Sequence, residues 1–531
     1  MTAHQTLDFD ACYRAASARD LRFDGRFYTA VTSTGIYCRP ICPARTPARR
    51  NVRFYRHAAS AEAAGFRPCR RCRPELSPGD PGWDAPADLV ARALRLIEDG
   101  VADEYGVAGL ADRLHVTERH LLRLFTARLG AGPLAVARTR RLLLAKQLLT
   151  ETALPVTDVA FAAGFGSVRQ FNATMKAAYG FAPSELRTSS RPAAASGREG
   201  PATLTLRLGH RTPYDAGALL GFLAARAIPG VERVGPDGYH RAVPGGTITV
   251  LPGDGHMRLS VTPADTRHLA RIVARCRRLL DLDADPAAID DALGATALRP
   301  LVARRPGLRV PGAFDGFELA VRAVVGQQVS VAGARTLLGR IAARAGTPSH
   351  SGGGAGDGEP FLLFPTAEHL ATSDLSGLGL TGRRMATLRL LAEQVASGAL
   401  HLDAGADPAE AAERLLAIPG IGPWTAGYIV MRALRDPDAW PAGDLGLRRA
   451  MSALGIPDDD VERWRPWRAY AAVHLWSTPA PETSGTSPSA RSPQNTHGSK
   501  NARSPRSRGD SPGRRSSRSS RSSAATTKEI A

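Results

Sequence analysis

The segment from Glu413 to Asp444, ERLLAIPGIGPWTAGYIVMRALRDPDAWPAGD, predicts two helices joined by a tight glycine hairpin. The hairpin consists of Pro419, Gly420, Ile421 and Gly422. Glycine tolerates a positive φ and has no side chain, so the N–H groups of such a hairpin can approach a phosphate at the positive end of the second helix. We therefore expect the hairpin to bind the DNA backbone without reading base sequence.

A single carboxylate, Asp444, lies twenty residues beyond Trp424 and directly before another helical segment. Beside a bound deoxyribose, a carboxylate could stabilise the positive charge that develops at C1′ when a base leaves. Taken separately, an aspartate before a helix is most often an N-cap, a tryptophan is usually in the core, and Pro-Gly-Ile-Gly can be an ordinary turn. The combination of hairpin, carboxylate and the downstream Trp476 favours a catalytic interpretation.

This segment resembles the helix-hairpin-helix DNA glycosylases, and within them the AlkA type of 3-methyladenine glycosylase. The resemblance rests on IPGIGPWTA, on PDAW and on Asp444. It implies that Asp444 is the catalytic carboxylate and that Trp424 and Trp476 are the walls of a base pocket. Members that form a Schiff base carry a lysine at the position of Trp424, so the resemblance implies a monofunctional, water-using enzyme without a cofactor. An aromatic pocket of this kind can hold a cationic alkylated purine by cation–π attraction.

Two more segments extend this resemblance toward the N-terminus. PYDAGALLGFLAARAIPGVE (213–232) resembles the N-terminal α+β domain of the AlkA type, and RPGLRVPGAFDGFELAVRAVVGQQVSVAGARTLLGRI (305–341) resembles its first helical block. The family often places an apolar wedge in this block, which enters the duplex where the base has left. By position Gln328 takes the place of this wedge, so the chain departs from the family in having a polar side chain there.

Four of the six cysteines form two close pairs, Cys38-x3-Cys42 and Cys69-x2-Cys72. In a reducing compartment this spacing predicts a tetrahedral zinc site with one ion per chain. A purely structural four-cysteine site is the commoner use of such spacing. The surrounding sequence RFYTAVTSTGIYC (26–38) predicts a strand, NVRFY (51–55) another, and SAEAAGF (60–66) a short helix.

TGIYCRPICPAR (34–45), NVRFY (51–55) and AAGFRPCRRC (63–72) resemble the metal-binding domain of Ada-type proteins. The resemblance implies that Cys38 accepts a methyl group from a DNA phosphotriester and is not regenerated. Zinc would keep the sulfur a thiolate, and methylation would change the charge of the site from −2 to −1, which should strengthen DNA binding. We interpret the remaining cysteines, Cys12 and Cys276, as small apolar residues.

Two repeats of a helix-turn-helix pattern, at 107–130 and 156–187, flank the long helical run RTRRLLLAKQLL (138–149). The pair resembles the AraC-type DNA-binding region. The candidates to face DNA are Arg119, His120, Ser167, Arg169, Gln170 and Asn172. The alternative is a helical bundle that binds no ligand. The net positive charge of the chain makes this alternative less favoured than DNA binding.

Composition supports a large protein that binds a polyanion. The chain has 531 residues, 43% of them hydrophobic, a net charge of +19 and a pI of about 10.5. No apolar run is long enough for a membrane span and the first residues have no signal-peptide pattern, so we expect a bacterial cytoplasmic protein associated with the nucleoid.

The fold class we expect is multidomain, mainly α with α+β modules. The expected parts are a zinc domain (1–78), an AraC-type helix-turn-helix region (86–188), a linker (189–201), a small α+β domain (202–284), a helix-hairpin-helix glycosylase domain (285–478) and a disordered Ser/Arg-rich tail (479–531). A glycine-rich stretch at 346–360 is expected to be a floppy surface loop.

These parts predict a DNA alkylation-repair protein that excises 3-methyladenine and 7-methylguanine and also acts as a methyl acceptor and transcription regulator. The expected partners are double-stranded DNA, both alkylated and promoter DNA, and RNA polymerase, with the chain a monomer. The alternative is a methylation-activated regulator whose glycosylase half binds DNA without turnover.

Overall fold

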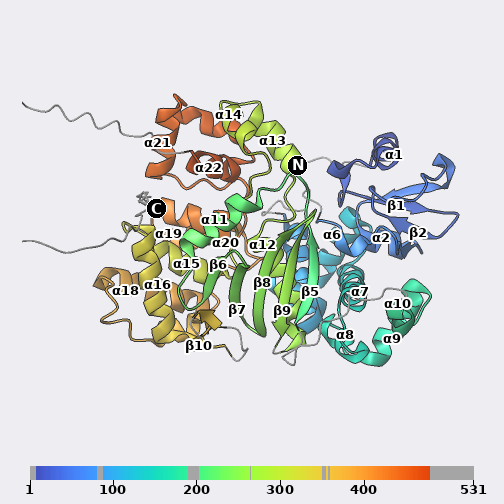
Figure 1. Ribbon diagram of the computed structural model, residues 1–531, viewed down its shortest axis with the longest axis horizontal. Coiled ribbons are helices and arrows are strands. Elements are labelled where there is room, and N and C mark those ends of the chain that lie inside the picture. The colour runs from blue at the N-terminus through green and yellow to red at the C-terminus, as the bar shows by residue number, and fades with distance from the viewer. Residues whose placement is uncertain are drawn as a thin grey trace, which may run out of the picture.

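The computed structural model describes residues 7–79, 88–188, 203–263, 265–349, 354–356 and 359–478 (Figure 1). The expected linker at 189–201 and the expected disordered tail at 479–531 lie outside these residues. Among the described residues, no helix combines the length and the apolar character needed to cross a membrane.

The N-terminal domain is a four-stranded sheet with the strand order β3-β1-β2-β4. Its elements are α1 (Phe9–Ala18), β1 (Tyr28–Val31), β2 (Ile36–Cys38), β3 (Val52–Tyr55), α2 (Ala58–Ala63) and β4 (Arg67–Pro68), with the short 3-10 turn η3 (Pro74–Leu76) after them. The expectation of a single strand over 26–38 is wrong. The chain reverses at Gly35, whose φ is +64°, and β1 and β2 pair antiparallel.

The next region is all helical and contains both expected helix-turn-helix units. Its helices are α3 (Leu89–Glu98), α4 (Val101–Glu104), α5 (Gly106–Arg113), α6 (Glu118–Leu129), α7 (Pro133–Glu151), α8 (Val156–Ala162), α9 (Val168–Tyr179) and α10 (Pro183–Thr188). The second helix of each unit has a hydroxyl N-cap, Thr117 or Ser167, and ends at a glycine with positive φ, Gly130 or Gly180. The long helix α7 joins the units and is buried along much of its length.

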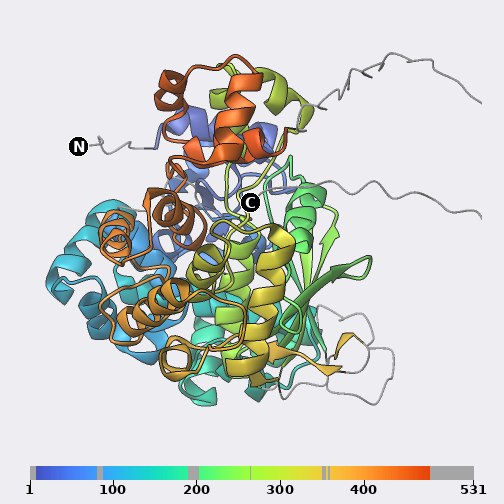
Figure 2. The ribbon, with the colours of Figure 1, turned by 90° about the vertical axis from the view of Figure 1, so that its left-hand side faces the viewer.

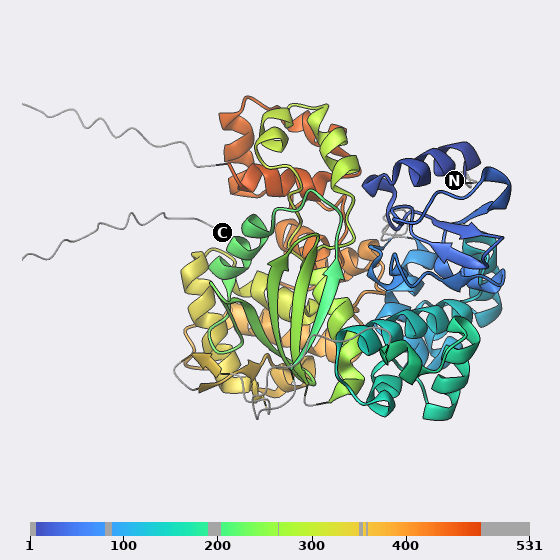
Figure 3. The ribbon, with the colours of Figure 1, turned by 45° about the vertical axis from the view of Figure 1, so that its right-hand side comes forward.

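A five-stranded antiparallel sheet with the order β5-β9-β8-β7-β6 lies at the centre of the molecule (Figure 3). Its strands are β5 (Leu204–Gly209), β6 (Glu232–Gly235), β7 (Gly238–Val243), β8 (Gly246–Gly253) and β9 (His256–Pro263), and α11 (Ala216–Arg226) and α12 (Leu269–Leu279) accompany it. Strand β6 is difficult to detect in the sequence, because its four residues, Glu-Arg-Val-Gly, include a glycine and two charges and show little alternation.

The C-terminal part is a helical domain whose first and last helices lie together above the others (Figure 2). Its helices are α13 (Pro286–Gly294), α14 (Arg299–Arg304), α15 (Gly316–Val325), α16 (Val331–Ala345), α17 (Ala367–Thr372), α18 (Gly382–Ala396), α19 (Pro408–Leu416), α20 (Pro423–Ala433), α21 (Leu445–Ala453) and α22 (Arg468–Trp476). One apolar core extends through this domain, with Leu415, Ile429 and Leu475 nearly inaccessible to solvent.

The expected floppy surface loop at 346–360 lies partly outside the described residues, at 350–353 and 357–358, and its described part contains short strands. Short strands occur there and just after it: β10 (Thr347–Pro348), β11 (Gly354–Gly356), β12 (Glu359–Pro360) and β13 (Leu362–Leu363). Strand β10 pairs with β13, and β11 pairs with β12. The strands are only two or three residues long, too short for a period-2 pattern to be detected in the sequence.

The N-terminal and C-terminal halves contact each other through ion pairs. Arg92 of α3 donates to the carbonyl of Gly405 at 2.7 Å and pairs with Asp407, the N-cap of α19, at 3.1 Å. Arg278 of α12 pairs with Asp99 at 2.8 Å. Both sets of contacts lie on α3 or at its C-terminal end.

A buried cluster of four charges joins the central sheet to α15. The cluster contains Glu232, Arg241, Glu318 and Arg322. Arg241 donates to both carboxylates and Arg322 donates to both as well, so each negative group has two positive partners. Burial alone would raise the pKa of Glu318, but Arg241 and Arg322 outweigh burial and lower it to about 2.

We predict that Glu318→Gln lowers the free energy of unfolding by about 3 kcal/mol at neutral pH, because it leaves two buried guanidiniums with one carboxylate. Since the folded pKa of Glu318 is depressed, its contribution is present above the ordinary value of 4.5 and is lost as the pH falls toward about 2. The difference in the free energy of unfolding between the intact protein and the variant should therefore become smaller as the pH falls from 4.5 toward about 2.

Urea unfolding followed by tryptophan fluorescence checks this, because five of the six tryptophans lie at 424–476. Glu368→Gln, the same exchange at an exposed site on α17, is the control. If the free energies of unfolding of the intact protein and of Glu318→Gln differed by the same amount down to pH 2, the prediction would be contradicted.

Candidate functional site

The predicted hairpin connects α19 and α20, and its backbone is tied to the protein on its inner side. The carbonyl of Pro419 accepts a hydrogen bond from the Thr387 hydroxyl at 2.8 Å, and the carbonyl of Gly420 accepts one from the Gln327 amide at 2.9 Å. Gly420 has a φ of +96°, and a Cβ there would clash with Thr387. In the described part of the chain, the N–H groups of Gly420 and Gly422 have no partner, so they are free to bind an anion.

Asp444 is at the centre of the C-terminal site and is only 6% exposed. It is the N-cap of α21, with Oδ1 accepting from the Leu447 N–H at 2.8 Å. The indole Nε1 of Trp424 donates to Oδ2 at 2.7 Å, and that of Trp476 donates to Oδ1 at 3.2 Å. Asp444 is thus an N-cap, as is usual for an aspartate before a helix. The same carboxylate also contacts Trp424 and Trp476, the two aromatic residues predicted from the sequence.

A third aromatic side chain, Tyr428, joins the two tryptophans. It stacks on Trp424 with ring centroids 5.5 Å apart and an interplanar angle of 16°, and it meets Trp476 edge-on at 6.2 Å. We did not predict Tyr428 from the sequence. The sequence could have indicated Tyr428, because it lies four residues after Trp424 and this spacing places both rings on one face of α20.

Guanidinium groups lie on the far side of Tyr428 from the carboxylate. Arg432 Nη1 donates to the Tyr428 hydroxyl at 2.7 Å, and Arg226 and Arg432 lie over the ring of Phe222 at 3.9 and 4.8 Å. Burial alone would raise the pKa of Tyr428, but Arg432 and Arg226 outweigh burial and lower it below its ordinary value. Negative charge is therefore concentrated at the Asp444 end of the aromatic cluster and positive charge at the other end.

The predicted wedge, Gln328, is exposed at the turn between α15 and α16. Its φ of +58° is in the left-handed region, which is uncommon for a residue with a side chain. The preceding residue, Gln327, connects this turn to the hairpin, so the two segments are neighbours although they are about 90 residues apart.

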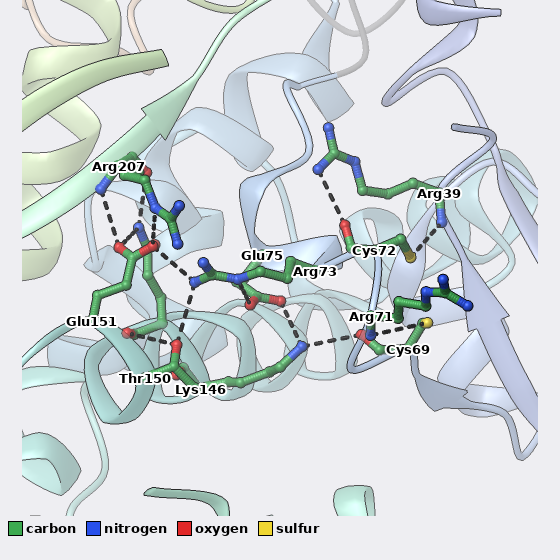
Figure 4. A network of polar contacts seen from close by, with 11 residues as sticks. Arg39, Cys69, Arg71, Cys72, Arg73, Glu75, Lys146, Thr150, Glu151 and Arg207 are labelled. Atoms are coloured by element: carbon green, nitrogen blue, oxygen red, sulfur yellow. Dashed lines mark hydrogen bonds and ion pairs between the residues drawn. The ribbon is translucent and has the colours of Figure 1, made fainter. Parts of the chain in front are cut away.

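The four predicted zinc ligands, Cys38, Cys42, Cys69 and Cys72, come together with all sulfurs within 4.8 Å of one another. Cys38 is the most accessible of them, since the other three are 7 to 8% exposed. The backbone N–H of Arg39 donates to Cys72 Sγ at 3.3 Å and that of Arg71 to Cys69 Sγ at 3.4 Å, as is usual around metal thiolates (Figure 4). Four soft sulfur donors at these separations fit a tetrahedral zinc ion.

A row of alternating charges leads from this cluster to strand β5 of the central sheet (Figure 4). In order, it contains Lys146, Glu75, Arg73, Glu151 and Arg207. Successive charged atoms are 2.8 to 3.0 Å apart, and Lys146 also donates to the carbonyl of Cys69 at 3.1 Å. The side chains of Lys146, Glu75 and Glu151 are at most 6% exposed. The zinc domain, α7 and the sheet are thus joined through ion pairs whose carboxylates are buried, while Arg207 at the sheet is about half exposed.

The predicted DNA-facing residues of the helix-turn-helix units lie at the starts of α6 and α9. The exposed ones are Arg119, Ser167, Arg169, Gln170 and Asn172, whereas His120 is half-buried and contacts Arg123. Ser167 has a structural task as well, because its hydroxyl accepts a hydrogen bond from the Gln170 N–H and caps α9. These residues, the zinc cluster and the Asp444 site belong to three separate regions and do not form one site.

The two remaining cysteines are buried and unreactive, as expected. Burial raises the pKa of Cys12 to about 11 and that of Cys276 to about 12. A thiol with such a pKa is a poor nucleophile at neutral pH.

Comparison with known proteins gives matches to three family models. They are the metal-binding domain of Ada over residues 11–75, a helix-turn-helix domain over 110–189 and the AlkA N-terminal domain over 205–315. The chain is also similar to a probable bifunctional transcriptional activator/DNA repair enzyme AlkA of Mycobacterium tuberculosis. That match has 48% identity and covers 89% of this chain and 96% of the relative.

Two other relatives match one half each. DNA-3-methyladenine glycosylase 2 of Escherichia coli is 34% identical over 51% of this chain and 96% of its own length. The bifunctional transcriptional activator/DNA repair enzyme Ada of Escherichia coli is 42% identical over 26% of this chain and 38% of its own length.

We predict that the purified protein contains one zinc ion per chain and that Cys69→Ala contains much less, because loss of one thiolate opens a four-ligand site. Metal analysis after dialysis measures the content. Cys12→Ser, which changes a buried cysteine outside the cluster, should keep its zinc. Equal zinc contents in the two variants would be incompatible with the proposed ligand set.

Proposed function

Because this chain belongs to the family of bifunctional transcriptional activator/DNA repair enzymes of the AlkA type, we propose specific roles for its residues in repair and in regulation. The protein is a DNA-alkylation repair protein in which a DNA-3-methyladenine glycosylase is joined to an Ada-type metal-binding domain and a helix-turn-helix region. The observation that carries the proposal for the glycosylase is the contact of the Asp444 carboxylate with two indoles beside the hairpin.

In the proposed reaction, the hairpin holds the DNA backbone through the N–H groups of Gly420 and Gly422, and the damaged base rotates out of the duplex. The base stacks on Trp424 and Trp476. A cationic base favours the end of the aromatic cluster next to Asp444, because the guanidiniums lie at the opposite end.

The bond between C1′ and the base nitrogen then breaks, and its electron pair leaves with the base, which becomes neutral. Positive charge develops on the sugar, and the carboxylate of Asp444 stabilises it. Water adds at C1′ and loses a proton to complete the hydrolysis. The indole N–H groups and the Leu447 N–H keep the carboxylate oriented before the base arrives. The proposed glycosylase reaction needs no cofactor.

The N-terminal half is proposed to accept a methyl group at Cys38, and the greater exposure of this residue favours it over the other three. Bound zinc would be held by Cys38, Cys42, Cys69 and Cys72 and would keep the sulfurs deprotonated. The Cys38 sulfur attacks the methyl carbon of a phosphotriester in line. The carbon–oxygen bond breaks, and the phosphodiester leaves with its negative charge.

Promoter DNA is the proposed partner of the helix-turn-helix units, through Arg119, His120, Ser167, Arg169, Gln170 and Asn172. RNA polymerase as a further partner and a monomeric chain are parts of the same proposal. The second candidate function is a methylation-activated regulator whose C-terminal half binds DNA without releasing bases.

We predict that the intact protein releases 3-methyladenine and 7-methylguanine from methylated duplex DNA and that Asp444→Asn lowers single-turnover release at least about 100-fold, since the negative charge at the sugar is lost. Chromatography of the free bases measures release. Asp374→Asn, an exposed aspartate before α18, should behave as the intact protein. If the intact protein releases no base, the second candidate function replaces the glycosylase.

We also predict that DNA carrying methyl phosphotriesters transfers one methyl group per chain and that peptide mass spectrometry finds it on Cys38. The methylated protein should bind promoter DNA more tightly, because the site loses one negative charge, and the gain should shrink as salt is added. Methyl groups on Cys42, Cys69 or Cys72 instead would refute the assignment of Cys38.

A further inference from the structure

Two segments that the glycosylase needs are joined by one side chain, Gln327. Its Nε2 donates to the carbonyl of Gly420 at 2.9 Å and lies 2.9 Å from the hydroxyl of Thr425. A carbonyl is only an acceptor, so the NH2 group of the amide must face Gly420. The side chain therefore crosses from the α15–α16 turn to the hairpin and to the first turn of α20.

Helix α18 also contacts both segments, the α15–α16 turn and the hairpin, through side-chain hydrogen bonds. Arg384 donates to the backbone carbonyl of Gln327, and Thr387 donates to that of Pro419. Both donors come from one rigid helix, one turn apart. The turn and the hairpin are thus held at a set separation by a shared support and by the direct amide contact.

Gln327 precedes Gln328, which is exposed and has a φ of +58°. A left-handed residue at the apex of a short turn has few alternative backbone conformations. Once Gln327 is anchored, the direction in which Gln328 leaves the turn is therefore determined. Gln327 itself is half-buried, whereas its neighbour Gln328 is exposed.

We propose that Gln327 is a positioning residue that holds Gln328 at a defined place relative to the phosphate-binding hairpin. This inference rests on the proposed glycosylase function and on the wedge position that the resemblance implies for Gln328. Binding energy from the phosphate contacts can be used to displace a base only if Gln328, the side chain at the wedge position, stays at a fixed distance from the hairpin. Gln327 provides that rigidity and does not itself contact the base or the sugar.

A purely structural role makes a different prediction. If Gln327 only satisfied the carbonyl of Gly420, its loss would weaken the hairpin, and DNA affinity would fall together with activity. A positioning role instead leaves affinity nearly unchanged, because the hairpin N–H groups remain, while extrusion of the base and its release both fall.

The test uses the full chain with Gln327→Glu, which keeps the length of the side chain but replaces the donor facing Gly420 by an acceptor. Gln327→Met, which removes the donor without adding charge, is the second variant in case the first does not fold. The tryptophan-fluorescence unfolding midpoint confirms folding. Gln394→Glu, the same exchange at a half-buried position on α18, which does not carry Gln327, is the matched control.

Three quantities are measured for each protein. Anisotropy of a labelled duplex gives Kd. Fluorescence of 2-aminopurine at the target position, in an Asp444→Asn background, gives the extent of base extrusion. Single-turnover release of 7-methylguanine at saturating DNA gives the rate. For Gln327→Met, which adds no charge beside the hairpin, we expect Kd to change by about threefold or less, because the phosphate contacts remain. For both variants we expect release to fall about 10- to 100-fold with a parallel loss of extrusion.

For Gln327→Met, a fall in affinity as large as the fall in release would overturn the inference. It would also be overturned if either variant extruded and released bases as the intact protein does. These results differ from failure of the proposed function itself. If the proposed function fails, the intact protein releases no base, and the inference about Gln327 then fails together with the proposed function.

Discussion

The carboxylate of Asp444 depends on three N–H donors that come from three different helices, α20, α21 and α22. No single helix could supply them, so the site exists only when the C-terminal core is packed. This explains why an almost fully buried carboxylate is tolerated. Its desolvation is offset by hydrogen bonds that the fold holds in place, and it remains in contact with the aromatic residues that bound the site.

The sequence predicted the parts of this protein whose evidence is local. The glycine hairpin, the two cysteine pairs and both helix-turn-helix units each follow from residues within about 35 positions of one another, and the structure contains all of them. The predictions that failed also concern local patterns. The strand expected over 26–38 is interrupted at Gly35, and the loop expected at 346–360 contains strands too short to detect.

The unpredicted residues act through partners that are distant in sequence. Gln327 is one of two adjacent glutamines, and nothing in the sequence indicates that it reaches Gly420, 93 residues away. Similarly, Arg432 is close to Phe222 only because α20 packs near α11. Periodicity identifies the buried face of a helix, but it does not identify the opposing residue. Such pairs need the three-dimensional structure.

The row of charges from Lys146 to Arg207 has a consequence for gene fusion. Each half of the protein supplies charged groups that the other half neutralises: Glu151 on α7 faces Arg207 on β5. A free-standing glycosylase has no reason to keep Arg207 there, whereas Glu151 also pairs with Arg73 of its own half and would lose only one of its two cations. Replacing one half by a homologue that never had a fused partner would therefore leave Glu151 facing a surface that was not selected to receive it, although the linker would be intact. In this chain the two halves are fitted to each other as well as connected, so recombination between fused and unfused relatives is constrained by the interface.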